Sequence, residues 1–164
     1  MDHNSIIDRN TFKVCTHAED HKDVFICDKE IANVVAALNK KGYKTIASCS
    51  GHYKIEYYEY LKKDISKLEE YQNSDRIIIK DIRDNDFDYW EEVDKTLMYI
   101  LFDKEYKFNN LPESFIVDNS NGKTCIEHII NFYDDNNKHR NIKAVTEEIE
   151  NKIKELEEWV NRLE

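Results

Sequence analysis

The chain has 164 residues, and its 34 acidic and 24 basic side chains give it a formal net charge of −10 at pH 7. A charge of this sign argues against non-specific binding to nucleic acid or to an anionic membrane. No apolar run approaches the roughly 20 residues that a membrane-spanning helix needs, and the first residues lack the basic and apolar segments of a signal peptide. Together with four widely spaced cysteines, these features predict a cytoplasmic protein with free thiols.

The length predicts a single domain over residues 1–164. Its first 22 residues show no hydrophobic periodicity, so we interpret the segment 1–22 as a mobile lead. A short strand is expected near residues 12–15 or near residues 24–26.

The clearest helix of the first half is predicted over residues 28–41, where apolar residues recur at helical spacing. Asp28 can cap its start, and Gly42 can end it in the left-handed conformation. A strand is expected at residues 43–48, because β-forming residues are frequent there. A second helix is plausible over residues 56–71.

The second half of the chain reads as strands followed by one long helix. Asn121-Gly122 predicts a hairpin, and apolar residues follow a helical period over residues 142–163. The pattern indicates an α+β fold, with a mixed, largely antiparallel sheet, helices packed on it and a long C-terminal helix. The strands are expected at residues 76–82, 97–102, 114–118 and 125–133.

The residues Ser48-Cys49-Ser50-Gly51-His52 form the chemically densest tract. Gly51 permits a tight turn that exposes backbone N–H groups, the two serines add hydroxyl donors, and His52 can hold or donate a proton near neutral pH. These groups would suit a carboxylate or phosphate ligand. The alternative is a structural turn in which the serine hydroxyls satisfy backbone groups and Cys49 is buried as a small apolar residue.

Cys49 and His52 also have the spacing of half a zinc site. Cys15 and Cys27 could supply further ligands, which would give a zinc-stabilised module. The spacing matches no zinc-finger pattern, and structural zinc usually needs paired knuckles, so these four residues are weak metal candidates.

An acidic run with embedded aromatic residues spans residues 84–94. Aromatic anchors inside an acidic rim are effective in protein interfaces, which predicts docking on a basic protein surface. The alternative is a solvated acidic loop. The residues predicted to contact the partner are Asp84, Asp86, Phe87, Asp88, Tyr89, Trp90, Glu91, Glu92 and Asp94.

The tract Gly42-Tyr43-x-Thr45-x-x-Ser48-Cys49-Ser50-Gly51-His52 resembles an element of small uncharacterised proteins of low-GC Gram-positive bacteria and their phages. This resemblance implies an anti-defence role, for example that of an anti-CRISPR inhibitor.

The same helix–strand–Ser-Cys-Ser-Gly tract is remotely similar to the tRNA wybutosine-synthesising methyltransferase family, which carries Ser-Ser-Cys-Ser-Gly-Arg. Here Ala47 stands at the first Ser and His52 at the Arg. The similarity implies S-adenosylmethionine as a cofactor, but His52 lacks the always-charged fork with which Arg binds a carboxylate or phosphate.

Of these functions, the sequence favours an acidic protein that binds a basic surface of a protein partner, without catalysis, because the net charge is a property of the whole chain. An enzyme or small-ligand binder centred on residues 48–52, methyltransferase-like in one form, is the first alternative. The zinc-stabilised module is the second.

Overall fold

The computed structural model describes residues 4–15, 23–51, 78–79, 91–92, 95–137, 140 and 142–164. The chain divides into two compact units. The first unit consists of Met1–Ser50, Leu97–His128 and Asn151–Glu164, and the second of Gly51–Thr96 and Ile129–Glu150.

The first unit begins with an antiparallel sheet in which β1 (Asn4–Asp8) lies between β2 (Val14–Cys15) and β3 (Val24–Asp28). Five residue pairs join β1 to β3. Both of the short strands considered near residues 12–15 and 24–26 are therefore present, and β1 is an additional strand that the sequence analysis did not predict.

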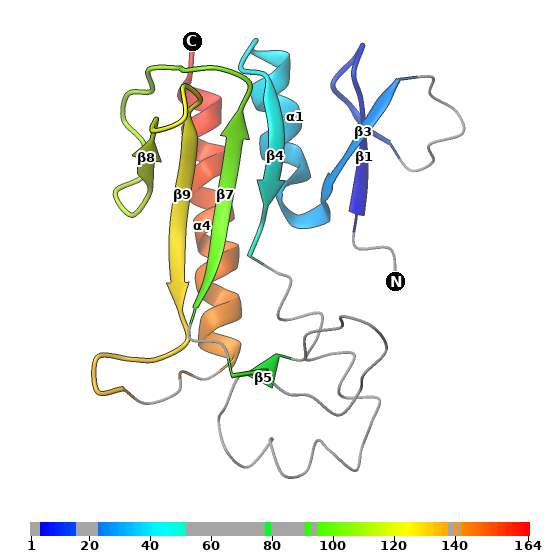
Figure 1. Ribbon diagram of the computed structural model, residues 1–164. Coiled ribbons are helices and arrows are strands. Elements are labelled where there is room, and N and C mark those ends of the chain that lie inside the picture. The colour runs from blue at the N-terminus through cyan, green and yellow to red at the C-terminus, as the bar shows by residue number, and fades with distance from the viewer. Residues whose placement is uncertain are drawn as a thin grey trace. The chain divides into compact units, whose positions relative to one another are not determined.

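The predicted first helix is present as a 3-10 turn, η2 (Lys29–Ile31), followed by α1 (Ala32–Lys40). α1 contacts strands β1 to β4 (Figure 1). Its end is the expected one: Gly42 has a φ of +92°. The N–H groups of Gly42 and Tyr43 donate to the carbonyls of Asn39 and Leu38, at 3.0 Å each, which is a Schellman arrangement.

The predicted cap at the start of this helix is wrong. Asp28 makes no side-chain cap hydrogen bond at η2. Its carboxylate instead accepts the backbone N–H of Ser50 at 2.7 Å. A contact between the ends of β3 and β4 has therefore replaced the local cap.

A second sheet has the strand order β4-β7-β9-β8. It consists of β4 (Thr45–Cys49), β7 (Lys95–Phe102), β8 (Ile116–Asp118) and β9 (Cys125–Asn131). The pairs β4–β7 and β8–β9 are antiparallel, and β7 and β9 run in opposite directions in Figure 1. The β8–β9 pair is the hairpin predicted around Asn121-Gly122, with Gly122 at a φ of +68°.

In the first unit, the C-terminal part of α4 (Ile142–Arg162) packs on one face of this sheet (Figure 1). Because side chains alternate along a strand, every second residue of β7 faces the helix, while the helix presents one apolar stripe. The core side chains between them are at most 1% exposed: Met98, Ile100, Phe102, Ile126, Leu156, Trp159 and Val160.

The second unit contains a two-stranded antiparallel sheet of β5 (Ile78–Ile79) and β6 (Glu91–Glu92), the ends of β7 and β9, and the first part of α4. Arg140 connects the start of α4 to the segment that follows β9. Its backbone N–H donates to the carbonyl of Phe132 at 2.8 Å, and its guanidinium lies 2.6 Å from a carboxylate oxygen of Glu148.

The α+β class, the largely antiparallel sheets and the long C-terminal helix are confirmed. The helix predicted over residues 56–71 lies outside the described residues. No described helix has the length and apolar character needed to cross a membrane.

Candidate functional site

The tract predicted as a ligand site ends β4. Ser48 and Cys49 are half-buried, Ser50 is fully buried, and Gly51 is buried at a φ of +76°. The positive φ is the tight turn that the sequence predicted for Gly51. His52 lies outside the described residues.

This corner already holds an anion of its own chain, because the Ser50 N–H donates to the carboxylate of Asp28 at 2.7 Å. An exogenous carboxylate or phosphate at that N–H would have to displace Asp28 and would meet its charge. The anion-site hypothesis for residues 48–52 stays a prediction. The structural alternative also stays untested, because the observed bond uses the backbone N–H of Ser50 and Cys49 is only half-buried.

Next to the corner, Cys49 pairs with Tyr99 across β4 and β7. Burial raises the pKa of the Tyr99 hydroxyl, with further contributions from Cys49, Asp28 and Cys125. Burial also raises the pKa of Cys125 to about 11, followed by the charges of Glu127 and Asp118. The Cys125 thiol is therefore more fully protonated near neutral pH than an ordinary thiol.

Three of the four weak zinc candidates, Cys15, Cys27 and Cys49, are described, and His52 lies outside the described residues. Cys15 pairs with Ile6, and Cys27 pairs with Ser5. Because adjacent residues of β1 point to opposite faces of the sheet, the two thiols lie on opposite faces. No group of three His, Cys, Asp or Glu side chains suited to a metal ion occurs among the described residues.

Burial, with a smaller contribution from the charge of the neighbouring Asp28, raises the pKa of Cys27 from the ordinary value of 9.0 to about 12. The folded chain therefore keeps this proton over a pH range in which the unfolded chain loses it. The stability that Cys27 contributes is present below pH 9 and is lost as the pH rises toward 12.

We therefore expect the free energy of unfolding to fall more steeply between about pH 9 and pH 11 in the wild type than in Cys27→Ala. Urea unfolding at a series of pH values measures both slopes. Cys125 and Tyr99 contribute in the same direction to both proteins, so the difference between the slopes isolates Cys27. Equal slopes would contradict the raised pKa.

The predicted acidic run is described only at Glu91 and Glu92, whose backbones form β6 and pair with Ile79 and Ile78. Its other members, from Asp84 to Trp90 and Asp94, lie outside the described residues. Their role in partner binding stays a prediction.

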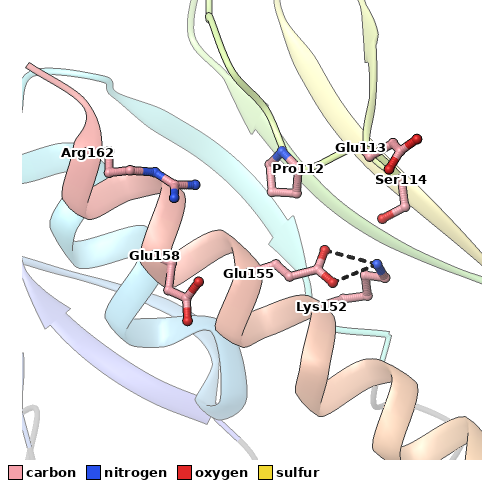
Figure 2. A pocket seen from close by; sticks show the side chains of 7 residues that line it. All are labelled: Pro112, Glu113, Ser114, Lys152, Glu155, Glu158 and Arg162. Carbon is pink, nitrogen blue, oxygen red and sulfur yellow. Dashed lines mark hydrogen bonds and ion pairs between the residues drawn. The ribbon is translucent and has the colours of Figure 1, made fainter.

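A pocket that the sequence analysis missed lies between α4 and the loop before β8, in the first unit. Its volume is about 410 Å³, within the range of small-molecule sites. Figure 2 shows the lining side chains, which come from α4 and from the loop before β8. We call it the α4 pocket; it is lined by Pro112, Glu113, Ser114, Lys152, Glu155, Glu158 and Arg162.

The charges in the α4 pocket are partly compensated. The ammonium of Lys152 donates to both carboxylate oxygens of Glu155 at 2.9 Å (Figure 2). Glu113 and Glu158 have no such ion pair with any other described residue. With Arg162 counted, the described lining residues include three carboxylates and two cations, which leaves one net negative charge among them.

The hydroxyl oxygen of Ser114 is buried and has no hydrogen-bond partner in the described part of the chain, and its side chain points toward α4 in Figure 2. A hydrogen bond to His128 holds the backbone of Ser114 in place: the Ser114 carbonyl oxygen lies 3.0 Å from Nδ1 of His128. A buried hydroxyl without a partner costs about 1–3 kcal/mol. The α4 pocket is therefore bordered by a buried polar atom that has no hydrogen-bond partner among the described residues.

No sequence signal marks this pocket. The Glu-rich face of α4 was visible, but its partner residues come from a loop far away in the chain. Comparisons of the chain with protein-family models, with curated proteins and with solved structures find no match. Inference about function therefore depends on the residues and geometry of this chain.

Proposed function

We propose that this protein binds a protein partner with a basic surface, and that the α4 pocket receives a lysine or arginine side chain of that partner. The observation that carries the proposal is the Ser114 hydroxyl, which has no hydrogen-bond partner among the described residues and belongs to a lining with three carboxylates. The net charge of −10 supports it independently, since an acidic chain attracts cationic surfaces at long range.

The chemistry of the pocket suits a cation. An ammonium or guanidinium carries only donors, and Glu113, Glu158 and the Ser114 hydroxyl are acceptors without an ion pair or hydrogen bond to other described residues. Lys152 is held by Glu155 and so opposes an incoming cation less than a free lysine would. Arg162 lies one helical turn beyond Glu158, toward the end of α4.

The anti-defence role implied by the sequence resemblance is a specific form of this function. Proteins that handle nucleic acids carry basic surfaces, and an acidic protein that docks on one competes with the nucleic acid. The predicted acidic run at residues 84–94 would be a second contact for such a partner.

Binding of fluorescein-labelled decalysine, followed by anisotropy at about 0.1 M salt, tests the pocket. We expect Glu158→Gln to weaken binding by about fivefold, as for loss of a partly exposed charge pair. The matched control is Glu105→Gln, which makes the same charge change at an exposed residue outside the pocket and should stay within about twofold of the wild type. Equal weakening by both variants would show that only the net charge of the protein affects binding, and it would overturn the proposed role of the α4 pocket.

Ser114→Ala gives a second test. We expect this variant to raise the free energy of unfolding by about 1 kcal/mol, because it removes a buried hydroxyl that has no partner in the part of the chain that the structure describes. The same variant should weaken decalysine binding, because the bound ammonium loses an acceptor. A loss of stability in Ser114→Ala, or unchanged peptide binding, would contradict the assigned role of the hydroxyl.

The acidic run is tested separately by changing Asp86, Asp88, Glu91 and Glu92 to Lys. If the run contacts the partner, this reversal abolishes capture of decalysine even when the α4 pocket is intact. Capture that is unchanged by the reversal would remove the run from the interface.

A further inference from the structure

We propose that a second pocket of the first unit binds a mononucleotide, with its base on aromatic rings and its phosphate on lysines. The pocket has a volume of about 490 Å³ and lies between the β1–β2 turn, β3 and the end of α1. We call it the basic pocket. It is lined by Arg9, Phe12, Phe25, Asn39, Lys40, Gly42 and Lys44.

The lining has a charge opposite to that of the whole protein. Among the described residues that line the basic pocket, three are cations and none is a carboxylate, although the chain carries a net charge of −10. Arg9 is paired with Asp23 at 3.1 Å. Lys40 and Lys44 are exposed and have no ion pair with the rest of the described chain. A local cluster of unpaired cations in an acidic chain favours an anionic ligand.

The aromatic residue Phe12 is held in a strained conformation. Its φ is +53°, a region that bulky L-residues rarely occupy and that Gly or Asn adopts easily. The turn enforces this conformation: the Asp8 carboxylate accepts the N–H groups of Asn10 and Thr11 at 2.7 and 2.9 Å, and the Asp8 carbonyl accepts that of Phe12 at 2.8 Å. An aromatic ring kept at a strained position indicates that the ring itself has a function.

The second aromatic ring, that of Phe25, lies next to the cation of Arg9. The guanidinium of Arg9 lies 5.0 Å from the centroid of the Phe25 ring, while its Nε pairs with Asp23. Both a phenyl ring and a guanidinium plane are surfaces on which nucleobases stack. Phe12, Phe25 and Arg9 therefore offer planar surfaces beside the two lysines.

The end of α1 accommodates an anion despite the negative end of its dipole. The carbonyls of Ala37, Leu38 and Asn39 already accept backbone N–H groups of residues 41–43. At Gly42, a Cβ would meet no atom within 4 Å, which agrees with open space beside this turn. Lys40 and Lys44 flank the same turn and supply the positive charge.

Calorimetric titration of the full chain with AMP, GMP, CMP and UMP tests the proposal. We expect at least one nucleotide to bind with a dissociation constant below about 1 mM. Adenosine has the base without the phosphate, and inorganic phosphate has no base. Each should therefore bind about tenfold more weakly than AMP or not at all. Absence of binding by all four nucleotides would overturn the proposal, as would equal binding of AMP and inorganic phosphate.

The double variant Lys40→Gln/Lys44→Gln should weaken nucleotide binding by about tenfold or more, because two charge-assisted contacts to the phosphate are lost. The matched control is Lys107→Gln/Lys123→Gln, which removes two exposed lysines outside the pocket and should leave the affinity within about twofold. Equal losses in both proteins would show a non-specific charge effect and would overturn the site.

Phe12→Asn separates ligand binding from folding. Since Asn tolerates a positive φ, we expect a thermal unfolding midpoint equal to or above that of the wild type, with nucleotide affinity reduced by about fivefold or more through loss of stacking. Unchanged affinity would remove Phe12 from the site. A short 5′-phosphorylated oligoadenylate provides a further test. If it binds about tenfold more tightly than AMP, the ligand is the 5′ end of a nucleic-acid strand and not a mononucleotide, and the proposal is overturned.

Discussion

Trp159→Ala is expected to lower the free energy of unfolding by about 3–5 kcal/mol. Trp159 is 1% exposed and packs edge-on against Phe108, with ring centroids 5.1 Å apart. Its indole N–H donates to the carbonyl of Asn109 at 3.2 Å. The substitution therefore opens a cavity in the core and leaves that carbonyl without its donor.

The loss should be large because Phe108 belongs to a wider aromatic cluster. Its ring also contacts Phe102 at a centroid distance of 4.9 Å and Tyr43 at 5.1 Å, so the space left by the indole borders side chains that hold β7 and the end of α1. Partial collapse of these rings would recover only part of the lost contact.

Urea unfolding followed by far-UV circular dichroism measures the effect. Trp159→Phe is the matched control, because it keeps an aromatic ring and removes the indole N–H. We expect it to cost less than Trp159→Ala, with loss of the hydrogen bond contributing about 1 kcal/mol. A loss below about 1 kcal/mol for Trp159→Ala would contradict a role of this residue in the core.

The elements with strong helical or alternating patterns were predictable from the sequence. α4 was expected over residues 142–163 and spans Ile142–Arg162, because its apolar stripe is long and regular. The end of α1 at Gly42 followed from the left-handed conformation that glycine adopts without strain. Both features depend on residues close together in the chain.

Features that depend on distant residues were missed. β1 was not expected because residues 4–8 do not alternate, and the strand exists through its pairing with β3. The Asp28 carboxylate was expected at a helix start and bonds to Ser50. The Ser114 hydroxyl faces α4 only because the chain folds back. The local propensities of the residues predict none of these contacts, so neither pocket could be located from the sequence alone.

Asn39→Leu is expected to lower the free energy of unfolding by about 3 kcal/mol, because it leaves several buried polar groups without partners. Asn39 is 7% exposed. Its amide nitrogen donates to the Val35 carbonyl and to the Thr45 hydroxyl, each at 2.8 Å, and its oxygen accepts the Thr45 N–H at 3.2 Å. These bonds join α1 to the first residue of β4.

A double-mutant cycle isolates the side-chain bond within this group. Thr45→Val removes the hydroxyl and keeps a residue that favours strands, so we expect a loss of about 1 kcal/mol. In Asn39→Leu, the hydroxyl of Thr45 is already without its partner, and the further change to Val then costs little or restores stability. The double variant should therefore lose less than the two single losses combined, by about 1 kcal/mol. Additive losses would mean that the Asn39 amide and the Thr45 hydroxyl contribute independently, and the link between α1 and β4 would then depend on the Thr45 backbone N–H alone.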